Sequence, residues 1–290
     1  MLLRIKNNAK YIFSLFTVIA SMIFGMISVL QMFVGWDFLG IDGENTGYKV
    51  IILGLILAGC AISALLGGIF FSNSKTIFSK DEVEIVVKYG DLMKIAFPKK
   101  NSGEKIVVIA VNRCFDTVVD QDIIKADTVH GQFLQLFAPD DASRQNLDDA
   151  IEASLQEFDM PYELLDRSDK RYGKLKRYPF GTVARITGEN GVAFFLLALT
   201  EFDLNCVAHC NRHQYVECIL KLFEYYDAHG QGKDLYLYPM GTKMARTGLS
   251  KVEALEVTAT LTKISKEYLK SKTTIIVDRR NKNEISIMTI

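Results

Sequence analysis

The stretch LYLYPMGTKMARTGLS, residues 235–250, has the residue types of an anion-binding loop. Its proline ends a short apolar strand, and Gly241 lets the backbone approach a ligand without an intervening Cβ. Thr242 adds a hydroxyl donor, while Lys243 and Arg246 add positive charge. Amides that lead toward a helix carry partial positive charge, so a phosphate is the natural occupant. The alternative is a plain turn whose basic residues face water.

Polar side chains also follow two other apolar runs. Asp91 and Leu92 come after VEIVVKYG, while Asn112 closes the run KIVVIAVN and Arg113 comes next. Open α/β sheets bind ligands where the carboxyl ends of their strands meet. We therefore predict that these four residues line a binding site together with the loop at Gly241.

The motif Tyr-Pro-x-Gly-Thr occurs twice, as YPFGT at 178–182 and as YPMGT at 238–242. No longer period surrounds the two segments, so we interpret the duplication as coincidence. Gly181 and Thr182 precede an apolar segment with the pattern of a strand, and we predict that they line the same cleft.

A metal site and hydrolytic chemistry are weighed as alternatives. The cluster CVAHCNRH offers Cys206, His209, Cys210 and His213 to zinc. Structural zinc sites usually pair their ligands across a loop, whereas this cluster runs into an amphipathic helix, so we predict no metal. The sequence has no Ser-His-Asp order, glycosidase-like carboxylate pair or nucleophile elbow, and no catalytic residue is predicted.

The amino-acid composition limits which partners and which cellular compartment the chain could have. Lys plus Arg and Asp plus Glu each number 34, so the net charge would not attract nucleic acid. The 5 cysteines are scattered, and an odd number does not suggest a disulfide framework. A reducing cytosolic face is favoured.

The elements that position these residues follow from periodicity. Apolar runs of strand length lie at 83–90, 105–112, 191–200, 234–240 and 273–278. Helical spacing of apolar residues occurs at 146–158, 211–230 and 250–269. This order predicts an α/β domain over 81–290, with a parallel or mixed sheet flanked by helices. The last helix opens with a capping box, Ser250 and Glu253, and its spacing places Val252, Leu255 and Ile264 on one face.

Residues 1–80 have the pattern of a transmembrane hairpin. The segments 11–36 and 50–74 contain no charged residue, and each exceeds the roughly 20 residues that cross a bilayer. A signal peptide is the alternative for the first segment, but no cleavage site follows it and a second span does. Cations lie outside the two spans while acids gather between them, so both ends of the chain are predicted to be cytoplasmic. The outer cations are Arg4, Lys6, Lys10, Lys75 and Lys80; the loop between the spans has Asp37, Asp42, Glu44 and a single cation, Lys49.

Small residues recur every fourth position in the second span, at Gly59, Ser63 and Gly67, and more weakly in the first, at Ser21 and Gly25. Such stripes allow helix backbones to approach closely. Two interpretations stay open: the two helices of one chain pack together, or chains associate through these faces. Because two helices cannot enclose a pore, any membrane activity requires several copies.

The order of the strand-end motifs over 83–280 resembles the macro domain, the ADP-ribose-binding module. In that resemblance Asp91 of GDL corresponds to the aspartate that accepts from the adenine amino group. Asn112 of VNRCF corresponds to the asparagine that approaches the distal ribose. The resemblance implies that the loop wraps the diphosphate with Gly241, Thr242, Lys243, Met244 and Ala245.

Departures from the family pattern refine the resemblance. Phe115 stands where a second asparagine is usual, and DQDIIKADTVHGQF replaces the glycine-rich loop of hydrolytic macro domains. The segments TVHGQ, YPFGT and YPMGT are more similar to the divergent macro domain of Thoeris antiphage effectors. With two membrane helices in front, the chain resembles the membrane-anchored effector of type II Thoeris systems.

That resemblance implies a receptor without enzymatic activity. A partner TIR enzyme would make a histidine adduct of ADP-ribose, the macro domain would bind it, and the membrane helices would oligomerise and damage the bilayer. The chain would be a multi-pass protein of the bacterial inner membrane that needs no cofactor. The alternatives are a membrane-anchored ADP-ribosyl hydrolase that positions water through Asn112 or Asp116, and a tethered nucleotide-binding scaffold without toxicity.

Overall fold

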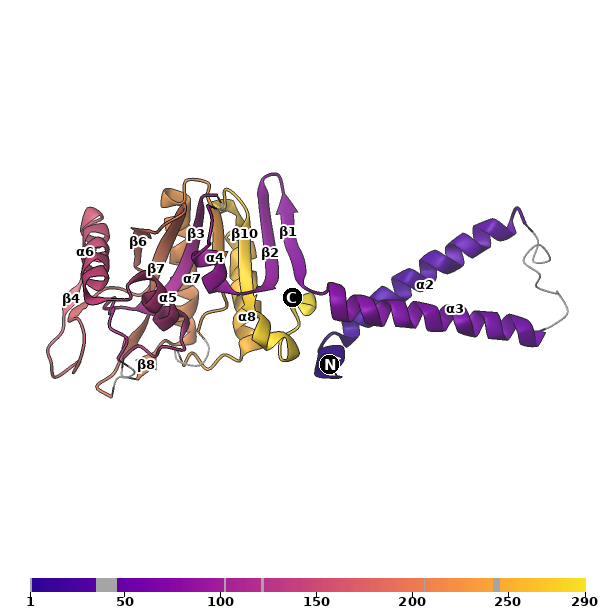
Figure 1. The fold of residues 1–290 in the computed structure, drawn as a ribbon, viewed down its shortest axis with the longest axis horizontal. Helices are drawn as coiled ribbons and strands as arrows, with labels where there is room; N and C mark the ends of the chain where they lie inside the picture. The colour runs from indigo at the N-terminus through magenta and orange to yellow at the C-terminus, as the bar shows by residue number, and fades with distance from the viewer. Residues whose placement is uncertain (1, 35–45, 102, 121–122, 206, 242–245) are drawn as a thin grey trace. The chain divides into compact units, whose positions relative to one another are not determined.

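The computed structural model describes residues 2–34, 46–101, 103–120, 123–205, 207–241 and 246–290 (Figure 1). The chain divides into two compact units. Met1–Lys75 together with Arg280–Thr289 form the hairpin unit, and Thr76–Arg279 with Ile290 form the sheet unit. The hairpin unit thus contains a segment that follows the whole sheet in sequence.

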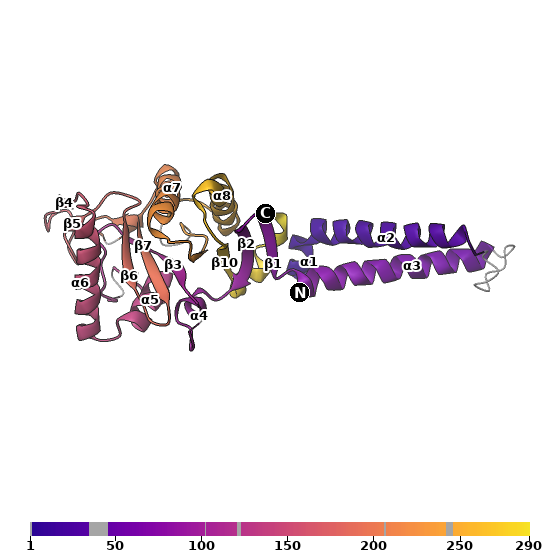
Figure 2. The ribbon, with the colours of Figure 1, turned by 90° about the horizontal axis from the view of Figure 1, so that it is seen from above.

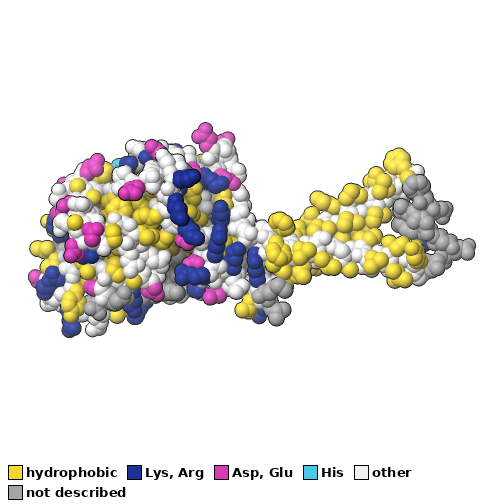
Figure 3. Space-filling view, in the orientation of Figure 1, with side chains coloured by type: hydrophobic (Ala, Val, Ile, Leu, Met, Phe, Trp, Pro, Cys, Tyr) yellow, Lys and Arg dark blue, Asp and Glu magenta, His cyan; other side chains and the backbone are white. Residues whose placement is uncertain are grey.

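Two long apolar helices make up most of the hairpin unit. The elements are α1 (Leu2–Asn7), α2 (Ala9–Gln31), α3 (Thr46–Leu66) and a π-helical continuation, η2 (Gly67–Phe71). Figure 1 shows α2 and α3 crossing near the start of α2 and separating beyond the crossing, and the face of the two helices that Figure 3 shows is largely apolar. By length and composition, Ala9–Gln31 and Thr46–Phe71 could each cross a membrane.

The small residues of the hairpin lie on two different surfaces, one between its two helices and one that is open. A Cβ on Gly68 would collide with Ile12, and one on Gly67 would lie 2.5 Å from Leu15 Cδ2, so these glycines let α2 and the end of α3 pack closely. At Gly59 and Gly25 an added Cβ would meet nothing within 4 Å. Packing within one chain therefore uses the Gly67 end of the stripe and leaves Gly59 on an open face.

A mixed sheet forms the centre of the sheet unit. Its strands are β1 (Ser74–Lys80), β2 (Val83–Gly90), β3 (Lys105–Asn112), β6 (Val183–Thr187), β7 (Val192–Phe202), β8 (Ala208–His209), β9 (Asp234–Leu237) and β10 (Thr273–Asp278). The order is β1-β2-β10-β9-β3-β7-β6, with β8 paired to β7. From β2 to β7 neighbouring strands are parallel, whereas β6 is antiparallel to β7. A separate pair, β4 (Glu163–Leu164) and β5 (Lys176–Arg177), lies off the main sheet.

Helices cover both faces of the sheet. They are α4 (Leu92–Ala96), α5 (Val129–Phe137), α6 (Asp141–Glu157), α7 (Arg212–His229) and α8 (Lys251–Ile264). Figure 2 shows α7 and α8 on one face and α4 and α5 on the other. α6 packs along the edge strand β6, where Ser154 Oγ accepts a hydrogen bond from the Arg185 amide at 2.8 Å. The predicted α/β class, a mixed sheet flanked by helices, is confirmed.

The predicted elements differ from the observed ones mainly at their ends. β7 continues to Phe202, β9 stops at Leu237, and α6 begins at Asp141 because Asp140 and Ser143 form a capping box. The predicted capping box of α8 is present. Of the predicted apolar face, Leu255 is buried, whereas Val252 and Ile264 are exposed. The other buried residues of the helix are Ala254, Thr258, Ala259, Leu261 and Thr262.

Candidate functional site

The candidate site lies at the carboxyl edge of the parallel strands. Gly90 ends β2, Asn112 ends β3, and the Gly241 loop follows β9. Because these strands run parallel within one sheet, their carboxyl ends share one edge. From β2 to β3 there are three strand spacings, or roughly 14 Å at about 4.8 Å each. Only an elongated ligand could contact both ends of this edge.

Asn112 is the most informative residue of the edge. Its side chain is buried, and Oδ1 accepts a hydrogen bond from the Cys114 amide at 2.9 Å, which caps the turn after β3. Its Nδ2 is also buried and finds no hydrogen-bond partner among the described residues. An unpaired buried donor costs about 1–3 kcal/mol. A ligand oxygen would supply the missing acceptor.

The turn after Asn112 is unusual in its backbone. Phe115, which stands where the family pattern has a second asparagine, adopts the left-handed conformation with φ +52°. Its ring is buried and packs edge-on against Tyr178 with centroids 5.6 Å apart. Burial raises the pKa of the Cys114 thiol, which keeps that side chain neutral. This turn is therefore held by the apolar packing of Phe115 together with the hydrogen bond from the Cys114 amide to Asn112.

Asp91 caps α4 at the far end of the edge. Its Oδ1 accepts hydrogen bonds from the amides of Met93 at 3.0 Å and Lys94 at 3.3 Å. The Asp91 side chain is exposed, whereas Leu92 is buried in the core. Of the two predicted residues, the carboxylate is therefore the one that a ligand could reach.

The loop after β9 is anchored at both of its described ends. Gly241 has φ +84°, and a Cβ there would lie 3.0 Å from Thr247 Cγ2 and from Tyr215 Cε2 of α7. Thr247 Oγ1 donates to the Gly241 carbonyl at 2.6 Å. Arg246 is exposed in a left-handed conformation, φ +49°.

Four of the predicted loop residues, Thr242, Lys243, Met244 and Ala245, lie outside the described residues. Their role in binding an anion stays a prediction.

Arg113 is engaged by the protein rather than directed at the Gly241 loop. Its Nε donates to the Tyr178 carbonyl at 2.6 Å, its guanidinium pairs with Glu201, and it stacks on Phe180 at 4.3 Å. The Arg113 carbonyl accepts from the Tyr178 amide at 2.9 Å. Arg113 thus joins the end of β3 to the segment 178–182.

Gly181 and Thr182 form a tight turn against α7. Gly181 has φ +82°, and a Cβ there would lie 2.6 Å from Lys221 Cδ and 3.3 Å from the Cys218 backbone. Thr182 is buried, and its hydroxyl donates to the Pro179 carbonyl at 2.9 Å. The structure therefore brings Arg113, Gly181 and Thr182 together near the β3 and β7 ends.

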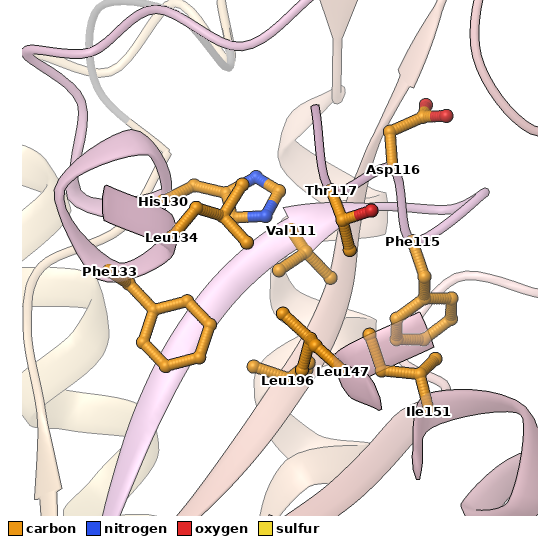
Figure 4. A pocket seen from close by; sticks show the side chains of 10 residues that line it. All are labelled: Val111, Phe115, Asp116, Thr117, His130, Phe133, Leu134, Leu147, Ile151 and Leu196. Carbon is orange, nitrogen blue, oxygen red and sulfur yellow. The ribbon is translucent and has the colours of Figure 1, made fainter. Parts of the chain in front are cut away.

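Asp116 is buried in an ion pair beside the candidate site. Its Oδ2 accepts from Lys170 Nζ at 2.5 Å and its Oδ1 from the Lys174 amide at 2.6 Å. Both charged side chains of the pair are almost fully buried. In Figure 4 the Asp116 carboxylate points away from the neighbouring pocket.

That neighbouring pocket lies between the sheet, α5 and α6 (Figure 4). Its empty volume is about 170 Å³, below the ~300–1,000 Å³ of ligand pockets. Its one imidazole, His130, stays neutral at pH 7 because burial, with a smaller contribution from Lys174, lowers its pKa to about 3. This pocket is part of the packed core.

The predicted absence of zinc concerns the segment around β8. Within the described ranges no group of three or more His, Cys, Asp and Glu side chains could hold a metal ion. His209 contacts Asp203 at 3.0 Å, Cys210 is buried, and Cys206 falls outside the described ranges.

Two residues near the site were missed by sequence reasoning. The ring of Tyr215 packs against Gly241, and its hydroxyl forms a hydrogen bond of 2.6 Å with Thr258. Burial raises the pKa of Tyr215 to about 12. Glu201 neutralises Arg113. Sequence periodicity predicts the helix that holds Tyr215 but gives no signal for which side chain lies under a loop from another element.

The sequence matches a known protein family. The family model for the macro domain of Thoeris protein ThsA matches residues 85–278. The Thoeris protein ThsA of Bacillus amyloliquefaciens (strain Y2) is 26% identical over 259 residues, which cover 86% of this chain and 80% of that protein.

Solved structures give more distant likenesses. An Oceanobacillus iheyensis macrodomain with ADP is 10% identical, with a TM-score of 0.47, over 72% of this chain and 90% of that one. A Bacteroides thetaiotaomicron protein of unknown function is 13% identical, with a TM-score of 0.39, over 68% and 100% of the two chains. These overlaps are partial, and we assign the family from the sequence match.

A mixed α/β sheet with polar groups gathered at its carboxyl edge is the architecture of a macro domain. The chain belongs to the family of Thoeris ThsA macro-domain proteins. The resemblance drawn from the strand-end motifs is thereby confirmed.

Proposed function

We propose that this chain is a membrane effector of antiphage defence. Its macro domain binds an ADP-ribose derivative, a histidine adduct made by a partner TIR enzyme, at the carboxyl edge of the sheet. Binding favours association of several hairpins in the inner membrane, which disrupts the bilayer and stops growth. Both ends of the chain lie on the cytoplasmic side.

The observation that carries the ligand assignment is the buried, unpaired Nδ2 of Asn112. Few buried polar groups in native proteins lack a partner, so such a donor at the mouth of a sheet favours a ligand acceptor there. The distance from Asn112 to Asp91, three strand spacings, suits a ligand with a base at one end and a sugar at the other.

The membrane assignment is supported by how little of the two long helices is buried within the chain. The apolar windows of the two long helices have 0% and 11% of their residues buried inside the chain. A core helix of a soluble protein would bury its apolar residues, whereas these residues need either lipid or other chains around them. The open faces at Gly59 and Gly25 would allow close approach of a second copy.

A sensor is favoured over a hydrolase because Asp116 is not available as a base. Lys170 and the Lys174 amide occupy both of its carboxylate oxygens. Asn112 cannot accept a proton at neutral pH, and Phe115 adds no polar group. Release of free ADP-ribose from ADP-ribosylated protein by the purified chain would contradict the sensor assignment.

A ligand can drive association only by binding the associated form more tightly. Moving the equilibrium from 1:99 to 99:1 requires about a 10⁴-fold preference. The direct test places the full chain in vesicles that contain a trapped dye and adds ADP-ribose or its histidine adduct. The proposal expects saturable binding and dye release that rises with ligand, and dye retained at saturation would contradict the membrane step.

The variant Asn112→Asp tests the ligand assignment. It keeps an Oδ1 that can cap the Cys114 amide, but it replaces the unpaired donor with an acceptor. We expect affinity for ADP-ribose to fall at least about tenfold, since a donor is lost and an acceptor faces the ligand oxygen. Calorimetry measures the affinity, and thermal unfolding checks that the variant folds. Unchanged affinity in a folded variant would remove Asn112 from the site.

A further inference from the structure

The hairpin unit contains a segment from the other end of the sequence. Residues 280–289, which we call the tail, follow β10 and belong to the same compact unit as α2 and α3. The tail buries three consecutive side chains, Ile285, Ser286 and Ile287. Burial of the two isoleucines stabilises the docked position.

A buried polar cluster fixes the tail to the base of the hairpin. Asn8, between α1 and α2, donates from Nδ2 to the Gly68 carbonyl at 3.0 Å and to Ser72 Oγ at 3.3 Å. Its Oδ1 accepts from the hydroxyl of Ser286 in the tail. Ser286 Oγ in turn accepts from the Met288 amide at 3.2 Å. Asn8 therefore connects both helices of the hairpin to the tail through one side chain.

Peripheral hydrogen bonds add to this cluster. Asn7 Nδ2 donates to the Asn283 carbonyl at 2.8 Å, Lys75 Nζ to the Met288 carbonyl at 2.8 Å, and Lys282 Nζ to Asn73 Oδ1 at 2.7 Å. They attach the tail to the end of α1 and to residues 73–75, which follow η2. Buried, mutually satisfied polar groups specify one arrangement, because a shifted tail would leave several of them unpaired.

The other end of the tail is continuous with the candidate ligand edge. β10 ends at Asp278, which is in register with Gly90 of β2. β10 lies between β2, which leads to Asp91, and β9, which leads to Gly241. A ligand that contacts both of these neighbours would lie across the end of β10, and the tail begins two residues later.

We propose that the tail couples ligand binding at the sheet edge to the base of the hairpin. The coupling runs through the hydrogen bond between Ser286 of the tail and Asn8 of the hairpin. This inference rests on the proposed function, since it requires a ligand at that edge. The tail is then the physical link between ligand binding at the end of β10 and the packing of α2 against α3, and the contact of Ser286 with Asn8 is its point of attachment.

The first test is hydrogen exchange of the full chain with and without ADP-ribose. The Met288 and Ile285 amides report on the tail, and we expect their exchange to change at least about fivefold when ADP-ribose binds. A chain that binds neither ADP-ribose nor its histidine adduct contradicts the proposed function. Binding with unchanged exchange in the tail overturns the inference and leaves the proposed function standing.

The second test uses two variants of the cluster, Asn8→Ala and Ser286→Ala, in vesicles of phosphatidylethanolamine and phosphatidylglycerol. Thr17→Ala is the matched control, because its hydroxyl donates to the Phe13 carbonyl within the same helix. At ADP-ribose concentrations that saturate each protein, dye release is expected to fall at least about tenfold in the two cluster variants but not in the control. Release equal to wild type overturns the inference. Release without ADP-ribose also overturns it, since the tail would then restrain the hairpin rather than carry the signal.

Discussion

Two turns of almost the same sequence, YPFGT at 178–182 and YPMGT at 238–242, have the same backbone twist at their glycines. Gly181 has φ +82° and Gly241 has φ +84°, and both glycines pack closely on α7. One turn bonds to β7 and the other follows β9, so they lie on opposite sides of β3. We interpreted the repeated motif as coincidence, yet in both copies the chain needs a glycine with positive φ that packs closely on α7.

The two turns differ in how their polar groups are used. In the first turn, Arg113, Lys221 and Thr182 donate to the carbonyls of Tyr178, Phe180 and Pro179. In the second turn, the Gly241 carbonyl accepts from Thr247 and the chain then enters the predicted anion loop. One turn is thus fixed by the protein itself, while the other leads to the candidate ligand. The surroundings of each turn, rather than the four shared residues, decide which task the turn performs.

The largest expected effect is on the second turn. Gly241→Glu places a carboxylate where the diphosphate is predicted to lie, and we expect affinity for ADP-ribose to fall by more than about 100-fold, or about 2.7 kcal/mol. Gly248→Glu is the matched control, since Gly248 also has a positive φ, +74°, but a Cβ there comes no closer than 4.0 Å to Arg212. Calorimetry of both variants gives the comparison.

The same experiment can separate charge from strain. A Cβ at Gly241 presses on Tyr215 and Thr247, so any substitution there also lowers stability. Gly241→Gln has the size of Glu without its charge. Equal losses of affinity in the Glu and Gln variants would mean that shape, and not repulsion of phosphate, explains the result.

A smaller effect, on stability, is expected in the first turn. Gly181→Ala forces a left-handed alanine against Lys221 and Cys218, at a cost of about 1–3 kcal/mol. Thermal unfolding should shift downward by roughly 2–4 °C for each kcal/mol in a unit of this size. Affinity for ADP-ribose should stay near that of the wild type once the variant is folded. A large loss of affinity would instead place this turn in the ligand site.

The smallest effect is expected at Thr182. Thr182→Val keeps the shape but removes the hydroxyl that donates to the Pro179 carbonyl, so the free energy of unfolding should fall by about 1 kcal/mol. Chemical denaturation measures this change. A stability equal to wild type would show that the turn does not depend on this bond.

Much of the sheet could be predicted because buried parallel strands are continuous apolar runs. Val83–Gly90, Lys105–Asn112 and Thr273–Asp278 have the predicted bounds. The buried face of α8 could not be predicted, because Thr258 and Thr262 donate to carbonyls of their own helix and become compatible with burial. Sequence periodicity counts such threonines as polar.

Positions that depend on distant pairing were also beyond the sequence. The strand-end motifs predicted Asn112 and Gly241 as site residues, but not that Nδ2 of Asn112 lacks a partner or that Tyr215 lies under Gly241. Nothing in the polar pattern of 279–290 predicted its contacts with Asn8. Such contacts join residues far apart in the chain, whereas periodicity describes only neighbours.

The central place of β10 has a consequence for biosynthesis. β2 and β9 do not pair with each other, and β10 joins them although it is the last strand of the sheet to leave the ribosome. Both hydrophobic helices are translated long before it, and domains form from the N-terminus onward during synthesis. On the proposed function, a nascent chain would therefore insert its helices into the membrane while the candidate ligand edge is still incomplete. The order of translation would then keep unfinished copies from binding the ligand.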